Sequence, residues 1–163
     1  NYRLYIKLLK MATICLVSSC GGHFMELIQL LPAIKKYDFY ILTEKNIASK
    51  SILNKYRHYN LIQQERKGLM FIFKFTWNII ISFFIFLKEH PDIIISTGAG
   101  AAYPTCRIAK LFGKKIIYIE SFAKINDKSK TGELVYKFAD KFYVQWPEML
   151  EIYPKAEYHG TVY

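Results

Sequence analysis

The chain has 163 residues, of which 52% are hydrophobic and 17% aromatic, and it carries a net charge of +10. This length suits one domain with a sizeable core, and the positive charge favours anionic partners such as phosphorylated ligands or a membrane surface. The basic residues are spread along the chain without the spacing of a nucleic-acid-binding module, so no nucleic-acid partner is expected.

Residues 1–10 precede a methionine, Met11, and are expected to be an extension or a tag remnant, whereas residues 11–163 are expected to form one domain. The three cysteines lack C-x-x-C spacing, which argues against disulfides and zinc, so no metal and no cofactor are expected.

Strand and helix patterns alternate over the whole domain. Strands are predicted at 13–18, 38–43, 58–63, 92–97, 115–120 and 141–145, and helices at 23–36, 46–56, 69–89, 103–112, 131–139 and 147–153. The strands are almost continuously apolar, as is typical of a parallel sheet buried on both faces. The sequence therefore predicts a doubly wound, Rossmann-like α/β fold, in which ligands bind beyond the carboxyl ends of the strands.

The first predicted strand ends in Ser18-Ser-Cys-Gly-Gly-His23 and opens into a helix. Glycines leave the backbone open to a ligand, and a helix start attracts anions, so Ser19, Gly21 and Gly22 are predicted to bind phosphate. His23 is a candidate proton acceptor, although a structural residue at the helix start would show the same pattern. The loop lacks the G-x-G-x-x-G fingerprint, which argues against a nicotinamide enzyme.

Two further strand ends are expected at the same edge of the sheet. One is the small-residue run Ser96-Thr-Gly-Ala-Gly-Ala-Ala-Tyr-Pro104, in which Thr97, Gly98 and Gly100 are predicted to join the phosphate site. The other ends on Glu120, a second candidate base. Close packing of a helix on the sheet would also explain the glycines, and a solvated strand terminus or a helix-capping role would also explain Glu120.

The segment 69–87 is apolar except for Lys74, Thr76, Asn78 and Ser82, and three of these four recur every four residues. The helix lies between two strands of one predicted sheet, so peripheral contact with a membrane is favoured over a span. Burial in the core or in a partner interface remains an alternative. The predicted membrane contacts are Phe71, Lys74, Phe75, Phe83 and Phe86, with Arg66 and Lys67 beside them.

Several runs together resemble a known family. They are Ser18-Ser-Cys-Gly-Gly-His23-Phe-Met-Glu26, His90-Pro-Asp-Ile-Ile-Ile-Ser-Thr-Gly-Ala-Gly-Ala-Ala-Tyr-Pro104, Tyr118-Ile-Glu-Ser121 and Phe138-Ala-Asp-Lys-Phe-Tyr-Val-Gln-Trp-Pro147. They are similar to the acceptor-binding subunit of the two-component UDP-sugar transferases of asparagine-linked glycosylation and of bacterial capsule and exopolysaccharide synthesis. That family is akin to the N-terminal half of the peptidoglycan glycosyltransferase that extends lipid I.

The resemblance implies the N-terminal half of a GT-B glycosyltransferase, without the lobe that holds the UDP-sugar. It implies a chain that is inactive alone, binds a lipid-pyrophosphate sugar acceptor at the cytoplasmic face of the membrane, and recruits a catalytic subunit to form a heterodimer. Inverting transfer needs a base for the acceptor hydroxyl, and His23 is the first candidate and Glu120 the second. The alternatives are a membrane scaffold without a functional site and a complete nucleotide-binding α/β enzyme.

Overall fold

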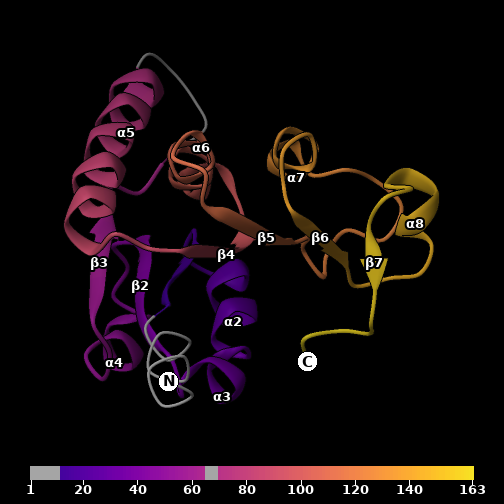
Figure 1. Cartoon of the computed structure of the whole chain (residues 1–163), viewed down its shortest axis with the longest axis horizontal. Coiled ribbons are helices and arrows are strands. Elements are labelled where there is room, and N and C mark those ends of the chain that lie inside the picture. Colours follow the sequence, from indigo (N-terminus) through magenta and orange to yellow (C-terminus); the bar gives the residue numbers. More distant parts are fainter. Residues whose placement is uncertain (1–11, 65–69) are drawn as a thin grey trace, which may run out of the picture.

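The computed structural model describes residues 12–64 and 70–163, which form a seven-stranded parallel sheet flanked by helices (Figure 1). The strands are β1 (Thr13–Ser18), β2 (Asp38–Glu44), β3 (His58–Leu61), β4 (Ile93–Gly98), β5 (Lys115–Ile119), β6 (Lys141–Val144) and β7 (Glu157–Tyr158). Their order, β3-β2-β1-β4-β5-β6-β7, confirms the predicted doubly wound fold. The expectations for residues 1–10, Arg66 and Lys67 fall outside the described residues.

Helices cover both faces of the sheet (Figure 1). On one face lie α5 (Met70–Glu89), α6 (Tyr103–Leu111) and α7 (Lys130–Tyr136), and on the other lie α2 (Gly22–Ile28), α3 (Leu31–Ile34) and α4 (Lys50–Leu53). The remaining helices are α8 (Met149–Ile152) and the 3-10 turn η1 (Gly100–Ala102). Each face has its own buried cluster, because alternate residues of each strand point to opposite sides.

The predicted helix at 23–36 is two helices, and the reason is Pro32. Proline has no backbone N–H, so it cannot continue the hydrogen-bond ladder of α2, and it instead occupies the first turn of α3. The predicted helix at 46–56 is reduced to α4 because the Asn46 side chain accepts a hydrogen bond from the N–H of Ala48, which forms a turn ahead of the helix. Strand β7 was not predicted, since two residues are too few to form a pattern.

Helix α5 buries polar side chains and exposes apolar ones. Asn78 is fully buried, and its amide both donates to the carbonyl of Ile62 and accepts from the N–H of Ile62, at 2.8 Å each. Ser82 is also buried and accepts a hydrogen bond from Thr105 of α6. The side of α5 that carries Asn78 and Ser82 therefore faces the protein, which leaves most of the aromatic surface of the helix outside.

Candidate functional site

A cavity of about 550 Å³ opens at the carboxyl ends of the central strands, on the face covered by α5 and α7. Its walls come from the ends of β1, β2 and β4, from the segment after β3, from the first turns of α5 and α7, and from η1 and the start of α6. The lining residues are Ser19, Cys20, Glu44, Gln63, Gln64, Phe71, Phe75, Ala99, Gly100, Ala101, Tyr103, Lys130, Thr131 and Leu134. The position agrees with the rule that open parallel sheets bind ligands beyond their carboxyl ends.

Glu44 fixes two walls of this cavity. Its buried carboxylate accepts hydrogen bonds from the N–H of Cys20 at 3.1 Å and from the N–H of Gln64 at 2.8 Å. The loop after β1 is thereby tied to the segment after β3. Burial raises the pKa of the Cys20 thiol, and the carboxylate of Glu44 raises it further, so this cysteine is a poor nucleophile.

The predicted site residues fall into separate groups. Ser19 and Gly100 line the cavity, as do Phe71 and Phe75 at the start of α5. Gly21, Gly22, Thr97, Gly98, His23 and Glu120 do not line it. The N–H of Ser19 donates to the carbonyl of Gly98, where β1 and β4 shift register.

His23 stands at the start of α2 and is held against the end of β4. Its Nδ1 lies 2.9 Å from the carbonyl oxygen of Thr97, and the hydroxyl of Thr97 donates to the carbonyl of His23. A carbonyl oxygen can only accept, so Nδ1 carries the proton and Nε2 of the neutral ring keeps its lone pair. A half-buried imidazole held in this way is suited to accept a proton through Nε2.

The two glycine loops have different surroundings. A Cβ at Gly21 or Gly22 would meet nothing within 4 Å, so the backbone of this loop is open to solvent. A Cβ at Gly98 would lie 2.8 Å from the hydroxyl of Tyr118 and 3.4 Å from Nδ1 of His23, and the φ of Gly98 is +105°. Gly98 is therefore required by close packing, which is the alternative explanation that its loop allowed.

Glu120 is enclosed in the protein. Its carboxylate is 1% exposed and accepts hydrogen bonds from the N–H of Ser121 and from the hydroxyls of Ser129 and Tyr153. It packs against Gly132, where an added Cβ would lie 2.0 Å from its Oε2. The structure thus gives Glu120 an anchoring role at the start of α7 and weakens the prediction that it is a base, because the carboxylate cannot reach an acceptor in this arrangement.

Sequence reasoning missed the network around Glu26, a buried residue of α2. Its carboxylate accepts hydrogen bonds from the hydroxyl of Ser121, the N–H of Phe122 and the Nε2 of Gln145, at 3.1, 3.2 and 3.0 Å. Burial raises the pKa of Glu26, while His23 and the three hydrogen bonds act in the opposite direction. The signal available in the sequence was a carboxylate on the apolar side of the predicted helix. Charged residues are buried only when they are paired, so its position indicated hydrogen-bond partners elsewhere in the chain.

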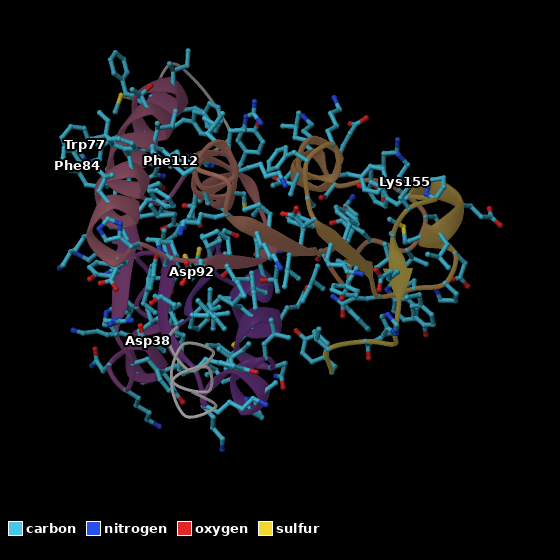
Figure 2. The ribbon with its side chains drawn as sticks, in the orientation of Figure 1. Asp38, Trp77, Phe84, Asp92, Phe112 and Lys155 are labelled. Atoms are coloured by element: carbon cyan, nitrogen blue, oxygen red, sulfur yellow. The ribbon has the colours of Figure 1, made fainter. Side chains whose placement is uncertain are left out.

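The outer side of α5 forms an apolar surface. Its exposed side chains are Met70, Ile72, Phe73, Trp77, Ile79, Ile80, Phe83, Phe84 and Leu87. Leu111 and Phe112, at the end of α6, are also exposed, and the Phe112 ring lies 6.3 Å from that of Phe83. Trp77 and Phe84 project away from the sheet in Figure 2. Within residues 12–64 and 70–163, α5 is the one helix long and apolar enough to cross a membrane, judged by length and composition.

Of the five predicted membrane contacts, the prediction for Phe86 is wrong. Its ring is 4% exposed and packs in the core, with the Phe112 ring 4.9 Å away. Phe83 faces outward, whereas Phe71 and Phe75 stack on each other at the cavity wall. Lys74 borders a second hollow of about 410 Å³, beside Gln63. Periodicity could not decide which side of a nearly uniform apolar helix faces the sheet.

The chain was compared with known proteins. Residues 13–162 match the family model described as oligosaccharide biosynthesis protein Alg14 like. The UDP-N-acetylglucosamine transferase subunit ALG14 of Mus musculus is 29% identical over 176 aligned positions, which cover 90% of this chain and 81% of the mouse protein. The proteins of the same name from Yarrowia lipolytica and Schizosaccharomyces pombe are 38% and 42% identical over 81 and 77 residues. Those matches span 46% and 44% of this chain but only 38% and 37% of the yeast proteins.

Solved structures show the same fold. MurG of Acinetobacter baumannii superposes with a TM-score of 0.74 at 14% identity, over 92% of this chain and 45% of MurG. A UDP-GlcNAc 2-epimerase from Neisseria meningitidis gives a TM-score of 0.69 at 11% identity, over 92% of this chain and 47% of the epimerase. The sheet is thus the N-terminal half of a GT-B fold. With its match over residues 13–162, the chain belongs to the Alg14-like family of oligosaccharide biosynthesis proteins.

Proposed function

We propose that this chain is the acceptor-binding subunit of a two-component UDP-sugar glycosyltransferase and that it works at a membrane surface. The observation that carries this proposal is the position of the cavity. The cavity opens between the carboxyl ends of the strands and the first turns of α5, where Phe71 and Phe75 form part of its wall. A polar strand edge therefore adjoins an exposed apolar helix.

A lipid-pyrophosphate sugar has the matching chemistry, with an apolar tail, an anionic diphosphate and a polar sugar. The tail would remain in the membrane against the outer side of α5. The diphosphate would lie at the mouth of the cavity, over Ser19 and Gly100 and the adjoining Gly21 and Gly22, with Lys130 of the cavity lining as a cation. Thr97 and Gly98 would support this loop by packing rather than contact the phosphates.

Sugar transfer then needs a base and a donor. Nε2 of His23 would take the proton from the acceptor hydroxyl as that oxygen attacks the anomeric carbon of the donor sugar. The bond between that carbon and the diphosphate of the nucleotide breaks, and the nucleoside diphosphate leaves. The donor would come from a second subunit that binds the UDP-sugar, so this chain would be inactive alone and active as a heterodimer.

A second subunit is supported by the names of the relatives. The mouse and yeast relatives are each named a subunit of a UDP-N-acetylglucosamine transferase. The fold described here corresponds to 45% of MurG. UDP-GlcNAc is therefore the first donor to test. A role in bacterial capsule or exopolysaccharide synthesis stays a prediction from the resemblance.

Attachment at the cytoplasmic face of the membrane is proposed to be peripheral. The two ends of α5 lead to β3 and β4 of the same sheet, and Asn78 and Ser82, in the middle of the helix, are hydrogen-bonded to the protein. A helix that is held along one side by its own domain can insert only its outer side into the bilayer interface.

The test is reconstitution of sugar transfer. The chain is purified from its native host together with any associated subunit, which is identified by mass spectrometry. Transfer from a panel of UDP-sugars to a lipid-pyrophosphate sugar in vesicles is then measured for each chain alone and for the pair. We expect transfer by the pair only. Efficient transfer by the isolated chain would overturn the two-component assignment, and equal transfer to a lipid acceptor without phosphate would overturn the diphosphate site.

A further inference from the structure

We propose that Glu26 is a positioning residue for His23, which it keeps oriented through a buried network that also holds the last residues of the chain. This inference rests on the proposed function, because it gives a role to a residue that contacts neither the cavity nor an acceptor. It also gives the segment 159–163 a role in keeping the imidazole of His23 in its orientation.

Helix α2 cannot hold His23 in place by itself. It is seven residues long, and its N-cap, Gly21, has no side chain to cap the first turn. Isolated helices of this length are unstable in water, so the orientation of α2 depends on its tertiary contacts. Apolar contacts of Phe24 and Leu27 fix the distance of α2 from the sheet, but they are not directional.

Directional contacts are made at two points of α2. The first is His23 itself, through its paired hydrogen bonds with Thr97. The second is Glu26, whose carboxylate receives three hydrogen bonds from the end of β6 and the loop after β5. The two residues are three positions apart, which places them on the same side of the helix, about one turn apart. A rotation of α2 that breaks the contacts of Glu26 would therefore move the imidazole away from Thr97.

The same network continues to the end of the chain. Nε2 of Gln145 donates both to the carboxylate of Glu26 and to the carbonyl of Glu120, and its Oε1 accepts from the N–H of Val162 at 3.0 Å. Next to it the Phe122 ring lies 5.4 Å from that of Tyr163. A single buried amide thus joins residues 26 and 162. Displacement of the 159–163 segment would withdraw a partner from Gln145, which can then reorient away from Glu26.

A carboxylate suits this position better than an amide would. Glu26 meets only donors in the described contacts, and a carboxylate accepts through both of its oxygens. In Glu26→Gln the new NH₂ group would face one of these donors and leave it without a partner, although the side chain keeps its size. The expected result is a folded protein in which α2 is held at one point instead of two.

The test on the chain itself is the tautomer of His23, read from the ¹⁵N and ¹H resonances of its ring at alkaline pH. His23→Gln identifies these resonances among those of the four histidines. We expect the wild type to show a proton on Nδ1, and Glu26→Gln to show a mixture of the two tautomers. Glu120→Gln is the matched control, because Glu120 is equally buried and also accepts three hydrogen bonds but anchors α7. The control should keep the wild-type tautomer.

A wild-type signal in Glu26→Gln, or an equal change in Glu120→Gln, would overturn the proposal. None of these outcomes depends on sugar transfer, so they remain decisive if the proposed function fails.

Kinetics of the reconstituted pair give the second measurement. Glu26→Gln should lower kcat about tenfold, which is less than the loss on removing a general base, and should change KM for the acceptor less than twofold. A rise in KM with an unchanged kcat would instead place Glu26 in acceptor binding and contradict a positioning role. Wild-type pairs without transfer would disprove the proposed function, and the tautomer measurement would still decide the role of Glu26.

Discussion

Helices α2 and α5 lie on opposite faces of the sheet and are attached to it in different ways (Figure 1). The seven residues of α2 are held by His23 and Glu26, each with hydrogen bonds to distant parts of the chain. The twenty residues of α5 use buried polar contacts at Asn78 and Ser82, and most of the apolar side chains of this helix remain outside.

The difference separates two requirements of the proposed function. A reacting group needs a fixed orientation, and buried hydrogen bonds provide it because they have preferred directions. A membrane contact needs apolar area without fixed geometry, which the outer side of α5 provides. The predictions below test whether each helix has only one of these roles.

The largest effect is expected for His23→Ala. The only other titratable group of α2, Glu26, is buried and engaged by three donors, so without Nε2 the transfer rate of the reconstituted pair should fall about 10²–10⁴-fold. Acceptor affinity should change little, because a base acts mainly in the transition state. Timed assays at a saturating acceptor concentration measure the rate of sugar transfer, and co-sedimentation with acceptor-containing vesicles measures acceptor binding. Transfer at the wild-type rate would show that His23 only stabilises the helix start.

The second comparison lies within α5, between two phenylalanines two positions apart. Phe86 is 4% exposed and Phe84 is 65% exposed. Phe86→Ala should lower the free energy of unfolding by about 3–5 kcal/mol through loss of core packing. Phe84→Ala should change it by about 0.5 kcal/mol or less and instead reduce vesicle binding. Denaturant unfolding and vesicle flotation separate the two effects. Equal vesicle binding by Phe84→Ala and the wild type would argue that this surface meets a protein partner.

The glycine loops provide the third test. Gly98→Ala should destabilise the protein by about 1–3 kcal/mol, because the φ of +105° and the hydroxyl of Tyr118 both oppose a side chain. Gly22→Ala should leave stability unchanged or slightly raised, since its Cβ meets nothing within 4 Å. It should still weaken acceptor binding, because the methyl group would stand where the diphosphate approaches the backbone. Thermal unfolding and acceptor titration distinguish these outcomes, and full affinity in Gly22→Ala would remove this loop from the site.

The smallest effect concerns pH and Glu26. Burial raises the pKa of this carboxyl in the folded protein, so the folded state keeps its proton to a higher pH than the unfolded chain does. The resulting stabilisation is complete below the ordinary glutamate pKa of 4.5 and is lost as the pH rises through the folded-state value. The stability of the wild type relative to Glu26→Gln should therefore fall with rising pH in this window. A difference that does not depend on pH would contradict the raised pKa.

The fold could be predicted from the sequence because its signals are local. Each apolar run and each glycine turn is read within about ten residues, and the alternation of strands and helices implies a parallel sheet with helices on both faces. The helix predicted at 23–36, which is two helices in the structure, shows the limit of such local prediction. Pro32 was visible, but whether it would divide the helix depended on the packing of α3 against the sheet.

The site was less predictable because its contacts join distant parts of the chain. Glu26 and Gln145 are 119 positions apart, and no local pattern connects them. The inward side of α5 could not be determined for the same reason, since Asn78 finds its partner in the segment after β3. The sequence showed that Lys74, Asn78 and Ser82 share one side of the helix. It did not show that this side faces the protein, because that depends on how α5 packs on the sheet.

The contact between Asn78 and Ile62 also bears on solubility. Strand β3 is an edge of the sheet, and an edge strand offers unpaired backbone groups to any other extended chain. Asn78 occupies both the N–H and the carbonyl of the residue that follows β3, as a residue of a neighbouring strand would. The opposite edge, β7, is only two residues long. Under the proposed function, a protein held at a membrane by the outer side of α5 would thus offer little free backbone to its copies next to Ile62 and along β7.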